Sequence, residues 1–167
     1  MITVLSSPKP GSGTSTTAAL LALSASTGAP TTLVDLCGDQ PAIFNCGTAA
    51  DPTYLNDRLT LLDASERPLR QQLEAIHAID SDNHVVIDAG TATHPIIVQL
   101  PAGTVSRWVI RPCYLALRRA GSSAVRPDEV IMLNELGRSL TADDVRQVLG
   151  APVVATIDVH PEIARLV

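Results

Sequence analysis

Short runs of apolar residues recur along the chain, and a loop and a stretch of helical periodicity follow most of them. Within the runs, apolar residues succeed one another without polar alternation, which is typical of strands buried on both faces of a parallel sheet. The pattern predicts six strands, at residues 1–6, 31–36, 84–88, 105–110, 129–133 and 152–157. Because helices separate the strands, we expect a doubly wound α/β fold with right-handed crossovers.

The expected helices carry start and stop signals. Asp51-Pro52 is typical of an N-cap followed by proline at the first helical position. Thr141 followed by acidic residues predicts a helix start, and Gly150 predicts its end. Besides the helix that starts at residue 51, we expect helices over residues 14–26, 65–78, 113–120 and 141–150, and a last one from residue 161. We find no repeat or linker and therefore expect residues 1–167 to form a single domain.

The most informative segment is the loop of residues 7–17, between the first strand and the first helix. A glycine-rich loop at that place joins backbone N–H groups to a helix N-terminus, which favours anion binding. In the standard phosphate loop a lysine follows the last glycine, but here Thr14 follows Gly13 and Ser15 takes the hydroxyl position. The alternative for this loop is a turn in which serine and threonine only cap the helix.

Composition narrows the function classes. The net charge of −5, the pI near 5.2 and the 2% of aromatic residues argue against broad nucleic-acid binding. No apolar run approaches the ~20 residues that span a bilayer, and no signal peptide is visible, so we expect a cytoplasmic protein without membrane contact. The three cysteines lack metal-ligand spacing and predict free thiols. Eleven of the twelve basic residues are arginine, and the single lysine is Lys9.

That lysine is part of a resemblance to the ParA/MinD family of positioning ATPases. The family has a deviant loop of the form K-G-G-x-G-K-[ST]-[ST], and residues 9–16 read Lys-Pro-Gly-Ser-Gly-Thr-Ser-Thr. Lys9 matches the signature lysine, which in the family reaches a phosphate in the partner subunit, while Thr14 replaces the second lysine. Asp35 resembles the first aspartate of the second-strand motif, and the second one falls on Cys37, with Asp39 two residues further on.

The resemblance extends along nearly all of the chain. Val85–Gly90 resembles the Walker B strand, in which Asp88 matches the acid on the magnesium side. Asn134 closes a strand at the place where the family contacts adenine, although asparagine is also a common turn residue. Family members usually continue further at the C-terminus than this chain does. The resemblance implies a P-loop NTPase-like three-layer sandwich, bound ATP or ADP with Mg²⁺, a homodimer, and a protein partner or cargo adaptor.

Carried over residue by residue, the resemblance implies three sets of site residues. The catalytic candidates are Lys9, Asp35 and Asp39. The metal candidates are Ser15, Asp35 and Asp88. The nucleotide-binding candidates are Gly11, Ser12, Gly13, Thr14, Ser15, Thr16 and Asn134. For Asp35 and Asp88 the alternative is a carboxylate that braces a loop, and we expect Cys37 to be a small buried residue without chemistry.

These observations lead to one main hypothesis and two alternatives. The main hypothesis is a positioning or partition protein with a degenerate ATP site, which binds nucleotide weakly or not at all, hydrolyses it very slowly if at all, and acts through dimerisation and partner binding. The first alternative is an active ATPase in which Lys9 replaces the missing lysine. The second is a structural or interaction module that is independent of nucleotide. A ligase of the same superfamily would need the lysine that Thr14 replaces.

Overall fold

The computed structural model describes residues 1–47 and 52–159, and a single sheet organises them. Its eight strands lie in the order β3-β4-β2-β5-β1-β6-β7-β8. All neighbouring strands are parallel except β3 and β4, which pair antiparallel at one edge. The strands are β1 (Ile2–Ser6), β2 (Thr31–Asp35), β3 (Thr53–Asn56), β4 (Leu59–Asp63), β5 (His84–Asp88), β6 (Val105–Ile110), β7 (Glu129–Glu135) and β8 (Val153–Val159).

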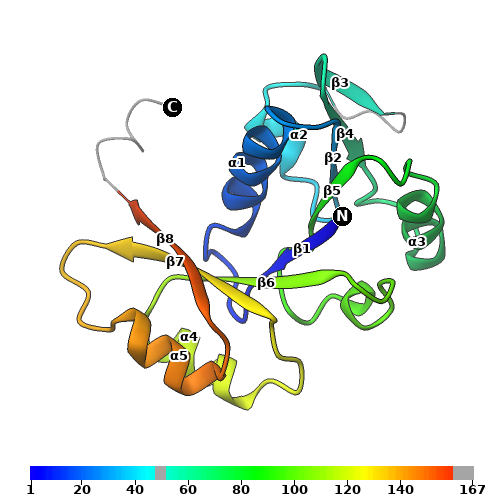
Figure 1. The fold of residues 1–167 in the computed structure, drawn as a ribbon. Coiled ribbons are helices and arrows are strands. Elements are labelled where there is room, and N and C mark those ends of the chain that lie inside the picture. The colour runs from blue at the N-terminus through cyan, green and yellow to red at the C-terminus, as the bar shows by residue number, and fades with distance from the viewer. Residues whose placement is uncertain (48–51, 160–167) are drawn as a thin grey trace.

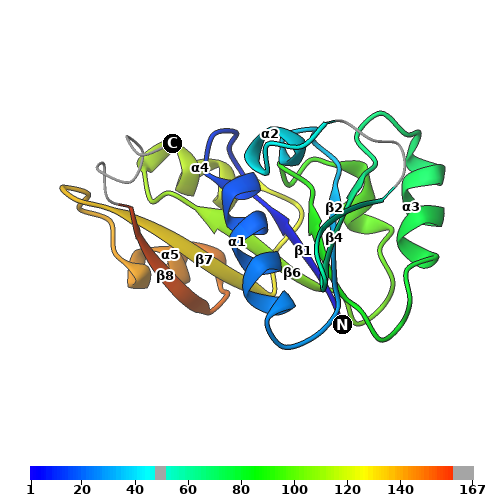
Figure 2. The same ribbon diagram turned by 90° about the horizontal axis from the view of Figure 1, so that it is seen from above.

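Helices cover both faces of this sheet (Figures 1 and 2). Residues of α1 pack on one face against Leu5, Leu33 and Val109, whereas α3 packs on the other face beside Val4 and Val34. Two more helices, α4 and α5, close the half of the sheet that holds β6 and β7. The helical elements are α1 (Thr14–Ser26), α2 (Gln40–Ile43), α3 (Leu69–His77), the 3₁₀ turn η1 (Pro95–Val98), α4 (Tyr114–Ser122) and α5 (Ala142–Leu149).

The predicted fold class is confirmed, and the six predicted strands are all present. The first helix runs over Thr14–Ser26 as expected, and α5 has a capping box at Thr141 and a left-handed Gly150 at its end. Helix α3 begins at Leu69, four residues later than expected, after Pro68 at the N-cap. The helix expected from Pro161 lies outside the described residues.

One predicted element is wrong. Asp51 lies outside the described residues, but the residues after Pro52 form the strand β3 rather than a helix. A turn at Asn56 joins β3 to β4, and the Asn56 side chain accepts hydrogen bonds from the backbone N–H groups of Arg58 and Leu59 at 2.8 and 2.9 Å. Because β4 pairs in parallel with β2, the hairpin adds two strands to the sheet, and the outermost strand, β3, runs antiparallel to β4. The proline therefore precedes a strand, where its fixed φ is equally acceptable.

The parallel arrangement brings the carboxyl ends of β1, β2, β5, β6 and β7 to one edge of the sheet. In open α/β sheets ligands bind beyond that edge. No helix among the described residues is long and apolar enough to cross a membrane.

Candidate functional site

The loop between β1 and α1 is held in shape by its own hydrogen bonds. The hydroxyls of Ser7 and Ser12 both donate to the Lys9 carbonyl oxygen, at 2.6 and 2.7 Å. Gly13 has φ +86°, and a Cβ at this position would lie 2.7 Å from Leu133 Cδ1. Only glycine fits there without strain, because the backbone is left-handed and the neighbouring side chain is too close. The structure thus holds the glycine loop against the end of β7.

Gly13 is also the N-cap of α1. It offers no side chain to the helix, and the first turn of α1 contains no acidic residue. A cavity of about 500 Å³ opens beside this helix end. Its lining comes from the loop, from α2 and from the end of β5, and comprises Pro10, Gly11, Gly13, Thr14, Ser15, Thr16, Asp39, Ala42, Ile43, Gly90 and Thr91. The positive end of the helix dipole favours an anion there.

Asp35 braces the loop that follows β2. Its Oδ1 accepts hydrogen bonds from the backbone N–H groups of Cys37 and Gly38 at 2.8 and 2.9 Å, and its Oδ2 accepts one from Gln40 at 2.8 Å. The side chain is fully buried, and desolvation raises its pKa although the three backbone donors oppose the rise. Both oxygens are therefore engaged by backbone, as in the loop-bracing alternative.

Asp88 is the last residue of β5 and has a different set of partners. Its Oδ2 accepts a hydrogen bond from Gln40 Nε2 at 2.8 Å, and its Oδ1 accepts one from the Gly90 backbone at 3.1 Å. Burial raises the pKa of Asp88, the Gln40 and Ser15 side chains oppose that rise, and the charge of Asp39 adds to it. Ser15 Oγ in turn donates to Asp39 Oδ2 at 3.1 Å. Ser15, Asp39 and Asp88 are thus brought together.

The oxygen atoms of Ser15, Asp39 and Asp88 are of the type that binds a magnesium ion. Mg²⁺ prefers hard oxygen ligands, and a hydroxyl with two carboxylates supplies them beside the helix that would carry the phosphates. Asp35, Cys37 and Asp88 also place one ligand atom each within 4.8 Å of one another, but a thiol is a poor ligand for magnesium. Of the predicted metal ligands, Ser15 lines the cavity beside Asp39, Asp88 is buried next to Ser15, and the Asp35 oxygens accept hydrogen bonds from the loop backbone.

Cys37 is exposed, so the expectation that it is buried is wrong. It lies in the loop that follows β2, and its Sγ lies 3.7 Å from the Asp88 carbonyl oxygen. Although the residue as a whole is exposed, its sulfur is partly buried beside Asp88, and this desolvation together with the neighbouring carboxylates raises the pKa of Cys37 to about 12. The thiol therefore stays neutral at physiological pH. The three cysteines are free thiols, as expected.

The remaining predicted residues are spread over the same edge. Thr14, at the position of the usual lysine, is buried, whereas Thr16 is exposed. Lys9 is partly exposed, and its charge helps to lower the pKa of Glu135 at the end of β7. Asn134 Nδ2 donates to Asp158 Oδ1 at 2.8 Å, which links the ends of β7 and β8. The amide of the predicted adenine-contacting residue thus already has a carboxylate partner.

The fold brings three further residues to this edge that no motif in the sequence marks as site residues, namely Gln40, Arg111 and Glu135. Gln40 is fully buried, and its Nε2 donates to Asp88 and to the Ser15 carbonyl oxygen at 2.8 and 2.9 Å. Arg111 follows β6, and its Nη1 pairs with Glu135 Oε1 at 3.0 Å. Their position in the sequence could have indicated Arg111 and Glu135, because both follow an apolar run and therefore lie at the carboxyl end of a predicted strand.

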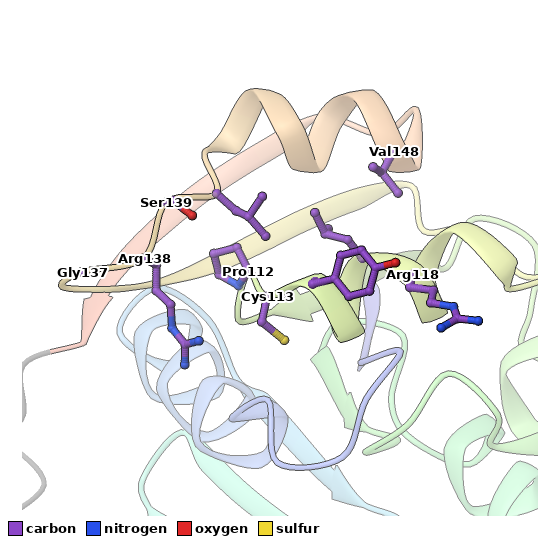
Figure 3. Close-up of a pocket in the computed structure, with 10 residues that line it drawn as sticks. Pro112, Cys113, Arg118, Gly137, Arg138, Ser139 and Val148 are labelled. Carbon is purple, nitrogen blue, oxygen red and sulfur yellow. The ribbon is translucent and has the colours of Figure 1, made fainter.

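A second cavity, of about 690 Å³, lies between the start of α4 and the loop that joins β7 to α5 (Figure 3). Pro112 and Cys113 lie on the α4 side of this cavity, and Val148 reaches it from α5. Arg118 and Arg138 add two cations to its otherwise largely apolar lining. Exposed apolar side chains surround it, with Tyr114 and Leu136 about 80% exposed (78% and 81%).

Comparison with known proteins supports the resemblance at the level of the fold. The structure is similar to a ParA family ATPase from Chlorobium tepidum, with a TM-score of 0.76 and 18% identity over 98% of this chain and 86% of that one. MinD in the MinC:MinD cell division complex of Aquifex aeolicus gives a TM-score of 0.79 and 17% identity, over 98% and 83%. The septum site-determining protein MinD of Pyrococcus horikoshii, complexed with Mg-ADP, gives 0.75 and 16%, over 98% and 83%. No protein-family model matches the sequence, and no curated protein matches it.

The doubly wound sheet with a glycine loop at the start of α1 matches the P-loop NTPase-like fold class. Within that class, the chain has the fold of the ParA and MinD ATPases over nearly its whole length.

Proposed function

We propose that the chain is a ParA/MinD-like positioning or partition protein with a degenerate nucleotide site. In this proposal it binds Mg–adenine nucleotide weakly, hydrolyses it very slowly, and acts through dimerisation and contact with a protein partner or cargo adaptor. The observation that carries the proposal is a cavity that the glycine loop, the uncapped end of α1, Ser15 and Asp39 line together, with the buried Asp88 in contact with Ser15.

Backbone groups and a helix end need no lysine to attract a phosphate group. Catalysis of phosphoryl transfer does need positioned charges and a group that orients the attacking water. Thr14 stands where the lysine is expected, and Cys37 stands where the resemblance places the water-orienting aspartate. Each lost donor typically costs about 3–4 kcal/mol of transition-state stabilisation. The proposal therefore combines nucleotide binding with very slow turnover.

Isothermal titration of the protein with Mg-ATP tests the binding part. We expect a weak but saturable heat that falls strongly in Gly13→Val, because the added side chain would collide with Leu133 and fill the loop. Thermal unfolding of the variant shows whether it remains folded. The absence of both heat and thermal shift at millimolar ATP would contradict nucleotide binding. It would favour the hypothesis of an interaction module that is independent of nucleotide.

The active-ATPase alternative assigns the missing charge to Lys9. Phosphate release by the wild type and by Lys9→Ala, measured under the same conditions, separates the two readings. Our proposal expects equally low rates. A measurable wild-type rate that disappears in Lys9→Ala would favour the alternative and assign a catalytic role to the single lysine.

Dimerisation distinguishes the proposal from the module that is independent of nucleotide. We expect light scattering to show a shift toward dimer when Mg-ATP is added, whereas a dimer that is unaffected by nucleotide supports the module. For the partner, the exposed Tyr114, Leu115 and Leu136 beside the second cavity offer apolar contact area. We propose no membrane contact, weak or no DNA binding because the chain is acidic, and a cytoplasmic location.

A further inference from the structure

A group of charged side chains lies at the end of β7, near Gly13. Glu135 sits at the end of β7 and pairs with two arginines, Arg111 Nη1 at 3.0 Å and Arg138 Nη2 at 2.6 Å. The hydrogen bond from Arg138, and then the charges of Arg111, Arg138 and Lys9, lower the pKa of Glu135. Two arginines therefore share one carboxylate at the end of β7, close to the glycine loop.

Arg111 is the member of this group that reaches the loop. A Cβ built on Gly13 would lie 3.9 Å from Arg111 Nη2. Glu135 occupies Nη1, and Nε is buried without a hydrogen-bond partner in the structure. The guanidinium thus has its Nη2 side toward the N-cap of α1, and its charge is only partly neutralised, because Glu135 is shared with Arg138.

We infer that Arg111 supplies the positive charge to the bound phosphates that the phosphate loop lacks at Thr14. The inference rests on the nucleotide binding proposed above and names the residue that makes it effective. An arginine suits this place, because a planar guanidinium can hold Glu135 on one side and a phosphate oxygen on the other. Lys9 differs, because none of its atoms lies within 4 Å of a Cβ built on Gly13, although its charge helps to lower the pKa of Glu135.

Titration of ATP, inorganic phosphate and adenosine into the wild type and Arg111→Gln tests this inference. Hydrogen bonds to charged groups contribute enough for us to expect about 10- to 100-fold weaker ATP binding in R111Q. We expect Arg111→Lys to retain part of the affinity, because it keeps the charge but loses the fork. Adenosine, which has no phosphate, is expected to bind the wild type and R111Q equally, whereas a merely structural role of Arg111 would weaken all ligands together.

Arg70→Gln is the matched control, because Arg70 is an exposed arginine on α3 that pairs with Glu74 at 2.8 Å. We expect it to bind ATP as the wild type does. ATP binding by a folded R111Q within twofold of the wild type would overturn the role of Arg111 while the proposed function stands. A wild type that binds inorganic phosphate but no ATP, or neither, would overturn both.

Discussion

At the scale of single residues, the site is dominated by buried carboxylates beside a sheet edge. Asp35 and Asp88 are both fully buried, and desolvation raises the pKa of each. A pKa that is higher in the folded than in the unfolded state stabilises the protein below the unfolded value, and this stabilisation is lost as the pH rises through the folded value. Ionisation of Asp88 in the folded protein therefore costs stability, as is common for functional sites.

Asp88→Asn tests this account. The amide cannot ionise, so we expect the wild type to lose stability relative to D88N as the pH rises from below 3.8, the ordinary aspartate value, through the raised pKa. Urea unfolding of both proteins at several pH values between about 3 and 8 measures the difference. Equal pH dependence in the two proteins would show that Asp88 does not titrate at a raised pKa. A constant offset between them reports only the altered hydrogen bonds to Gln40 and Gly90.

Gly90 shows how closely the backbone approaches a side chain in the site. It has φ +62°, and a Cβ at this position would lie 2.6 Å from Cys37 Sγ. We expect Gly90→Ala to destabilise the protein by about 2–3 kcal/mol, from the left-handed backbone and the collision together.

The double variant Cys37→Ala with Gly90→Ala separates these two causes. Removing the sulfur relieves the collision and leaves only the backbone strain, of about 1–2 kcal/mol. Urea unfolding of the two single variants and the double variant forms a double-mutant cycle. Additive losses would mean that the sulfur does not restrict this position.

At the scale of elements, local signals predicted most helix ends. Thr141 Oγ1 accepts a hydrogen bond from the Asp144 N–H at 3.3 Å, and the Asp144 side chain accepts one from the Thr141 N–H at 2.7 Å. The hydrogen bond from the Thr141 N–H, together with one that the Thr141 hydroxyl donates to Asp144 Oδ2 at 2.8 Å, lowers the pKa of Asp144. The hairpin of β3 and β4 carried no comparable signal, because its place at the sheet edge depends on the pairing of β4 with the distant β2.

The cap of α5 can be tested by substitution. We expect Thr141→Val to destabilise the protein by about 1 kcal/mol, because the N–H in the first turn loses its acceptor while the side-chain shape is kept. Thr141→Ser keeps the hydroxyl and serves as the matched control. Urea denaturation measures both variants, and equal stabilities of the serine and valine variants would show that the cap contributes nothing.

At the scale of the whole molecule, one continuous sheet connects three groups of buried residues. Trp108, the only tryptophan, is fully buried in the group formed with α4 and α5. We therefore expect a single cooperative unfolding transition, with tryptophan fluorescence and far-UV circular dichroism giving the same midpoint. A separate fluorescence transition would indicate that the β6–β8 half unfolds on its own and that the chain is not one cooperative unit.

The sequence by itself determined the α/β class, the six parallel strands, the first helix and the glycine loop, because these depend on local apolar runs, caps and turns. Only the tertiary structure decided which side chains meet. It turned Asp35 into a brace for its own loop and placed Asp39 beside Ser15. It also placed Arg111 beside Gly13, almost a hundred residues away in sequence. Such contacts depend on strand order and on the direction in which each side chain leaves the sheet edge, and neither is encoded in a local pattern.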